Sequence, residues 1–111
     1  MDTAHYMYSG GRYTYAVFMC HLAIEKAIKG LYQERIGKFP AKSNNLIYLL
    51  NEIKLKPPEA HGKFIVKLNE ASIMTRYPED LSKLQQIYTK AVVRDILTQA
   101  EELVKWIKIQ L

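Results

Sequence analysis

Apolar residues recur at steps of three and four positions along most of the chain, which is the pattern of helices that bury one face. From Arg12 onward the pattern is carried by Tyr13, Ala16, Val17, Cys20, Ile24, Ala27, Ile28 and Leu31. Phe18 and Leu22 form a second row beside this stripe. The apolar face is therefore wider than one neighbour usually covers, and it predicts a helix that is central or contributes to a dimer.

Glycine and proline divide the chain into segments. Gly10-Gly11 limits residues 2–9 to a short helix with Asp2 or Thr3 as its N-cap, and Gly37 with Pro40 ends the long helix that follows. Leucine spacing then predicts a short helix over residues 46–53, capped by Ser43 or Asn44.

The second half of the chain contains two more predicted helices. Pro58 is suited to the first position of a helix that runs toward Thr75 and is ended by Pro78. The remainder carries an almost pure four-residue ladder at Leu84, Tyr88, Val92, Ile96, Ala100, Leu103, Ile107 and Leu111. Two interpretations remain open here. The segment forms one long helix, or a new helix begins within it with Thr89 as its N-cap.

Alternating apolar and polar positions, Asn-Gly turns and internal repeats are absent from the sequence. We therefore expect an all-α fold, an up-and-down antiparallel helical bundle of four to five helices. At 111 residues the chain has the length of one domain, which we expect to span residues 1–111.

Composition narrows the function classes only a little. No apolar run approaches the roughly 18 residues of a membrane span, and the first residues lack the pattern of a signal peptide. The single cysteine, Cys20, cannot form an internal disulfide and falls on the apolar stripe, so we expect a core residue and a cytoplasmic protein. Glycine-rich phosphate loops and Cys/His metal spacings are absent, so neither a cofactor nor a metal is expected. The net charge of +5 permits an anionic partner.

The first candidate constellation is His21, Glu25 and Lys29, at successive four-residue steps on the polar side of the long helix, with Lys26 beside them. One interpretation is a Glu-to-Lys helix pair next to a solvated histidine. The other is a ridge that binds an anion or performs acid-base chemistry.

The second constellation is Arg76, Tyr77 and Asp80 around Pro78. A cation at a helix end and acids at the next helix start suit the helix dipoles, so the group is consistent with a structural corner. An arginine fork beside an aromatic ring is also what phosphate and base recognition uses.

Four stretches in order resemble a known family. They are GRYTYAVFMCHLAIEKAIKGLY (11–32), SNNLIYLL (43–50), TRYPEDL (75–81) and YTKAVVRDILTQAEELVKWI (88–107). Together they look like successive blocks of a HEPN domain, the higher eukaryote and prokaryote nucleotide-binding family. The resemblance implies a helical bundle that is commonly homodimeric. In bacteria and archaea such proteins are often encoded beside a minimal nucleotidyltransferase, with which they form a toxin-antitoxin-like pair.

The ribonuclease members of the family carry an arginine followed, after four to six residues, by a histidine. None of the arginines here, at positions 12, 35, 76 and 94, has a histidine at that spacing. Many relatives also have a histidine before Asn-Leu at the cap of the short helix, where this chain has Asn44. By position, Glu25, Lys26 and Lys29 match the first block of the family, and Arg76 and Tyr77 match the RYP block.

The leading hypothesis from the sequence is a non-catalytic HEPN protein, a homodimer that binds nucleotide or RNA, a minimal nucleotidyltransferase partner, or both. Lys26, Lys29, Arg76 and Tyr77 are its candidate contacts, and His21, Glu25, Asn44 and Asp80 are secondary candidates. Two alternatives stay open. One is a metal-independent ribonuclease with an atypical site, using His21 as base. The other is a module that only dimerises or binds a protein.

Overall fold

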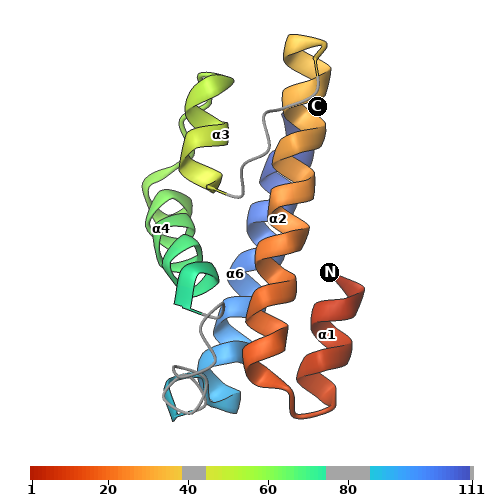
Figure 1. Ribbon diagram of the computed structural model, residues 1–111, viewed down its shortest axis with the longest axis vertical. Helices are drawn as coiled ribbons and strands as arrows, with labels where there is room; N and C mark the ends of the chain where they lie inside the picture. Colours follow the sequence, from red (N-terminus) through yellow and green to blue (C-terminus); the bar gives the residue numbers. More distant parts are fainter. Residues whose placement is uncertain (39–44, 75–85, 111) are drawn as a thin grey trace.

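The computed structural model describes residues 1–38, 45–74 and 86–110. Within these ranges it contains the helices α1 (Asp2–Ser9), α2 (Tyr13–Ile36), α3 (Leu46–Glu52), α4 (Glu59–Met74) and α6 (Lys90–Ile109), and no strand (Figure 1). The predicted all-α fold is confirmed.

α2 is the central helix. It packs against each of the other four, as its wide apolar face predicted. Figure 1 shows α2 and α6 running in the same direction, with α1 and α4 running the opposite way, so that these four helices alternate up and down along the chain. The guanidinium of Arg35 donates to the carbonyl oxygen of Gln110 at 3.4 Å, which joins the C-terminal ends of α2 and α6.

The predicted glycine breaks on either side of α2 are confirmed. Gly11, at φ 76°, lies in the turn that separates α1 from α2. Gly37 ends α2 in the left-handed conformation at φ 75°, and its N–H donates to the carbonyl of Gln33. Glycine adopts this conformation without the steric penalty of a Cβ. The predicted core stripe is buried at Ala16, Val17, Cys20, Ile24, Ile28 and Leu31.

Two predicted caps are wrong. Met1, rather than Asp2 or Thr3, is the N-cap of α1. For α3 the N-cap is Asn45, whereas Ser43 and Asn44 lie outside the described residues. The Asn45 side-chain oxygen accepts the N–H groups of Ile47 at 3.1 Å and Tyr48 at 3.2 Å, so it occupies two donors that the first helical turn leaves unpaired.

α3 ends in a Schellman motif with an unusual residue. The N–H of Leu55 donates to the carbonyl of Leu50, and that of Lys54 donates to the carbonyl of Asn51, both at 3.1 Å. The left-handed position of this motif is usually glycine, but here it is Lys54, at φ 53°. A left-handed conformation costs an L-residue with a Cβ roughly 1–2 kcal/mol, so this backbone is strained.

The start of α4 lies one residue after the predicted one. Glu59 is its first residue, and the carbonyl of Pro58 accepts the N–H of Gly62 at 2.9 Å. The predicted end at Pro78 lies outside the described residues.

The last segment is not one continuous helix. Thr89 caps α6, and its hydroxyl oxygen accepts the N–H of Val92 at 3.4 Å. The interpretation in which a new helix begins after Thr89 is therefore confirmed. The ladder predicted a helix and α6 is one, but the ladder does not follow the buried face in the first half of α6: Val92 is exposed and Ile96 only partly buried, whereas Val93 and Leu97 are buried. Four residues turn a helix about 40° beyond one full turn, so a pure four-residue ladder leaves the buried face.

Candidate functional site

The first sequence candidate is a pair of charges on α2 rather than an open ridge. Nζ of Lys29 lies 3.5 Å from a carboxylate oxygen of Glu25, one helical turn before it. The side chains keep 34% and 12% of their surface exposed, respectively, so the pair is largely shielded from solvent. Lys26 is exposed and does not line either of the grooves described below. The predicted Glu-to-Lys pair is confirmed.

The interpretation of His21 as a solvated residue is wrong, because only 2% of its surface is exposed. Thr14 and Glu25, which lie on the same helix, are also buried. The reason is that α2 is surrounded by four helices, so its polar side is covered as well as its apolar stripe. A side chain in this position is part of the core.

The second sequence candidate lies outside the described residues, as does one secondary candidate. Arg76, Tyr77 and Asp80 belong to the range 75–85, and Asn44 belongs to the range 39–44. The structure therefore brings together Glu25 and Lys29 but does not test the corner around Pro78.

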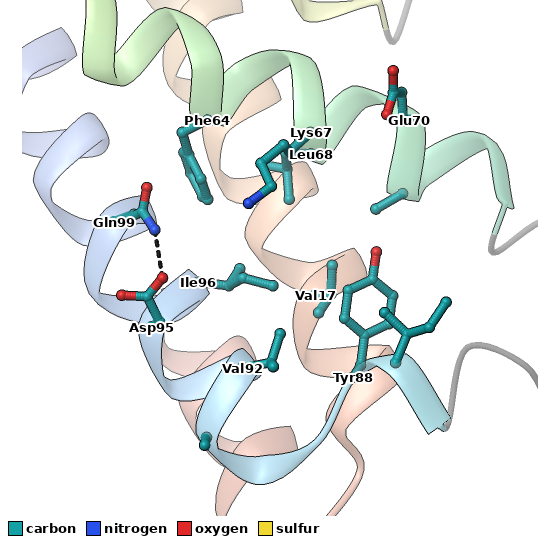
Figure 2. Close-up of a pocket in the computed structure, with 13 residues that line it drawn as sticks. Val17, Phe64, Lys67, Leu68, Glu70, Tyr88, Val92, Asp95, Ile96 and Gln99 are labelled. Carbon is teal, nitrogen blue, oxygen red and sulfur yellow. Dashed lines mark hydrogen bonds between the residues drawn. The ribbon is translucent and has the colours of Figure 1, made fainter.

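A groove lies between α4 and α6 (Figure 2). It has a volume of about 590 Å³, within the range of ligand and peptide sites. Its apolar lining comes from three helices and the residues before α6, namely Val17, Phe64, Leu68, Ala71, Ile87, Tyr88, Ala91, Val92 and Ile96. We call it the α4–α6 groove.

The groove exists because α6 carries two adjacent apolar rows. Val93 and Leu97 point into the core, and Val92 and Ile96, one position earlier, face α4 instead. Figure 2 shows Val92 and Ile96 directed toward the α4 side chains, with Val17 of α2 behind them. The second row is too far around the helix to join the core, and it forms a side of the groove.

Positively charged, negatively charged and neutral polar side chains surround this apolar surface. Lys67 and Glu70 extend from α4, and Asp95 and Gln99 extend from α6. The amide of Gln99 donates to a carboxylate oxygen of Asp95 at 2.6 Å, which holds both side chains along the edge of α6. One lysine and two carboxylates give the rim a formal charge of −1, so it does not favour a phosphate.

Tyr88 lies at the end of the groove where the chain enters α6. Its ring is half-buried, and Figure 2 shows its hydroxyl directed toward α4. Burial, and after it the negative charge of Glu70, raise the pKa of the phenol. A tyrosine hydroxyl can donate a hydrogen bond to an acceptor on a bound molecule.

Sequence reasoning missed this groove because its two sides belong to different helices, and the periodicity of one helix does not show which other helix it faces. Tyr88, Val92 and Ile96 were identified only as members of the four-residue ladder that predicted the last helix. The available signal was the doubled apolar row at 92–93 and 96–97, since one helix face can bury only one row completely.

A second groove lies between α3, the loop after it and α4, and we call it the α3–α4 groove. It has a volume of about 500 Å³ and is lined by Ile47, Leu50, Asn51, Lys54, Leu55, Lys56, Pro57, Gly62 and Val66. Two lysines and no acid belong to this lining, in contrast to the α4–α6 groove. Sequence reasoning did not identify it either.

The remaining histidines make contacts between helices. His5 on α1 forms an ion-pair contact with Glu101 on α6. The ring of His61 packs against that of Trp106, with centroids 5.9 Å apart. Among the described residues, no group of three or more His, Cys, Asp and Glu side chains is placed to hold a metal ion. No helix within the described ranges has the length and apolar character needed to cross a membrane.

Of the three comparisons with known proteins, one found a match. Neither the comparison with curated proteins nor that with solved structures found a match. A family model does match: the model of the HEPN domain aligns with residues 1–110, which is nearly the whole chain. On this match, together with the helical bundle, the chain belongs to the HEPN domain family.

Proposed function

We propose that this protein is a non-catalytic binding member of its family, a homodimer that takes a protein partner of the minimal nucleotidyltransferase type, nucleotide, or both. The observation that carries the proposal is the α4–α6 groove, an apolar surface with charges of both signs at its rim. Protein interfaces combine an apolar centre with a polar rim in this way.

The groove favours a second copy of the chain as its occupant. In a two-fold symmetric interface the same patch meets itself, so it must be complementary to itself. Lys67 on the α4 side and Asp95 on the α6 side supply opposite charges that can pair across such an axis. The apolar row of Val92 and Ile96 would then pack against its own copy.

The nucleotide part of the proposal requires a different surface. Because the α4–α6 rim has a formal charge of −1, a phosphate would be repelled there. Lys26 is exposed on α2 and remains a proposed contact for a phosphate or for an acidic partner surface, as do Lys29, Arg76 and Tyr77.

The burial of His21 supports a binding role over the ribonuclease alternative. A general base must reach the proton that it removes within hydrogen-bond distance, directly or through one water. His21 is enclosed in the core, so it lacks this access to an RNA substrate.

Sedimentation velocity tests the homodimer. We expect the wild-type chain to sediment as a dimer at micromolar concentration and Val92→Glu to sediment as a monomer, because a carboxylate would be buried in the interface. Val92 is 42% exposed in the single chain, so the substitution leaves the core intact.

Ile109→Glu is the matched control for this experiment. It places the same charge on the same helix at a residue that is 79% exposed and lies outside the groove. We expect it to remain dimeric. A monomeric wild-type chain, or a dimeric Val92→Glu variant, would show that this groove does not carry self-association.

The nucleotide part is tested by calorimetric titration with ATP, GTP and a short RNA. Measurable heat that is reduced in Lys26→Gln would support it. Absence of heat with all three would remove it and leave the protein partner.

A further inference from the structure

The α3–α4 groove combines an apolar floor with positive charge alone. Leu50 and Leu55 supply the floor, and Ile47 and Val66 line its sides with 38% and 44% of their surfaces exposed. Lys54 and Lys56 are the only charged residues in its described lining, and both are exposed.

The described lining of the groove contains no acid that could neutralise these lysines. Glu52, the last residue of α3, lies outside that lining. Glu59 on α4 forms an ion pair with Lys63 at 3.2 Å. The groove therefore presents its positive charge to a bound partner.

The position of Lys54 is an independent sign that its side chain has a role. It occupies the left-handed position of a Schellman motif, where glycine would be free of steric strain. A strained backbone conformation is a reason to look for function at that residue. Lys54 is part of the groove lining, as is Leu55 of the same turn.

We infer that the α3–α4 groove binds an acidic amphipathic segment of a partner protein, with apolar side chains in the groove and carboxylates against Lys54 and Lys56. This inference rests on the proposal that the chain binds a protein partner, and it names the chemistry of that partner. An amphipathic helix laid into an apolar groove is a common mode of peptide recognition.

Two other occupants fit less well. A second copy of the same groove would bring like charges together, since no acid belongs to the described lining. Single-stranded RNA uses aromatic rings and arginines as stacking platforms, and the described lining contains neither.

The test uses a fluorescein-labelled helical peptide of about 18 residues, with leucines along one face and glutamates on both sides of them. A matched peptide carries glutamine in place of each glutamate. Fluorescence anisotropy measures affinity, and amide chemical shifts of the labelled protein locate the site. We expect the acidic peptide to bind, to shift residues 47–66, and to bind less tightly as salt is raised.

The variant Lys54→Gly/Lys56→Gln removes both charges, and glycine keeps the turn that ends α3. We expect it to bind the acidic peptide about tenfold more weakly, while its melting temperature does not fall and rises where glycine relieves the strain at position 54. Its control is Lys90→Gln/Lys105→Gln, which removes the same charge from exposed residues outside the groove. This control should bind like the wild type.

Several outcomes would overturn the inference: no binding of the acidic peptide, equal binding of the glutamine peptide, or equal weakening in the control variant. A labelled RNA that binds wild type and loses affinity only in Lys54→Gly/Lys56→Gln would assign the groove to nucleic acid instead. Sedimentation velocity of the same samples tests the homodimer independently of peptide binding. Val92→Glu is expected to change self-association, but it alters no residue of the α3–α4 groove, so failure of one proposal can be distinguished from failure of the other.

Discussion

Asn69 of α4 is hydrogen-bonded to the residue that caps α3. Its side-chain nitrogen donates to the side-chain oxygen of Asn45 at 3.4 Å, and its own side-chain oxygen accepts the N–H of Leu46 at 3.2 Å. The start of α3 is thus held by a residue that lies 24 positions later in the chain. This contact ties α3 to α4 at one end, and the two helices together form the α3–α4 groove.

Replacement of Asn69 by alanine should destabilise the protein by about 1–2 kcal/mol, because the N–H of Leu46 is partly buried and loses its acceptor. Chemical denaturation followed by circular dichroism measures the change. Asn51→Ala is the control, because Asn51 is exposed and its side chain has no hydrogen bond among the described residues; it should change the free energy of unfolding much less. Equal losses in the two variants would contradict the bridging role of Asn69.

The pair of Glu25 and Lys29 should contribute more to stability than an exposed pair of the same spacing. Lys29→Met leaves a carboxylate that is only 12% exposed without its cation, and we expect a loss of about 1–2 kcal/mol. Lys63→Met breaks the corresponding pair with Glu59, in which both side chains are more than three-quarters exposed, and should change stability by less than about 0.5 kcal/mol. Similar values for both variants would show that the environment of Glu25 has no effect.

His21→Ala should lower stability without changing any reaction on RNA. Removal of a buried ring leaves a cavity, for which we expect a loss of about 2–4 kcal/mol by chemical denaturation. Wild type and variant are incubated with labelled RNA in the presence of a chelator, and neither should cleave it. Cleavage by wild type that disappears in a folded His21→Ala variant would restore the ribonuclease alternative.

Cys20 should be unreactive in the folded protein. Burial raises the pKa of its thiol to about 12, so almost no thiolate is present at pH 8. Iodoacetamide followed by mass spectrometry should show no modification in buffer and complete modification in denaturant. Rapid labelling without denaturant would show that the core around Cys20 opens readily.

The same shift in pKa makes stability depend on pH. The unfolded thiol, with a pKa of 9.0, loses its proton before the folded one does, so stability falls as pH rises from 9 toward 12. Below pH 9 the thiol contributes no slope. Cys20→Ala should show a shallower decline in this range than the wild type, measured by denaturation at several pH values, and identical slopes would contradict the assignment.

The helix ends illustrate how far local sequence determined the structure. Gly37 was predicted to end a helix and Thr89 was one of two open alternatives for the start of the last one. Both form the expected hydrogen bonds, because these signals act within one turn of the chain. The caps at Asp2, Thr3, Ser43 and Asn44 were wrong by one or two positions. At those sites several neighbouring residues could supply a cap, and the pattern did not distinguish between them.

The sequence by itself determined the family, the all-α class and the buried stripe of α2, because each depends on local signals, on periodicity or on the order of blocks. The tertiary structure decided that His21 and Glu25 are buried, that Val92 is exposed and that Ile96 is only partly buried. It also decided that two grooves of opposite formal charge exist. These properties depend on which helices surround a residue, and helices far apart in the chain leave no trace of their contact in the periodicity of either one.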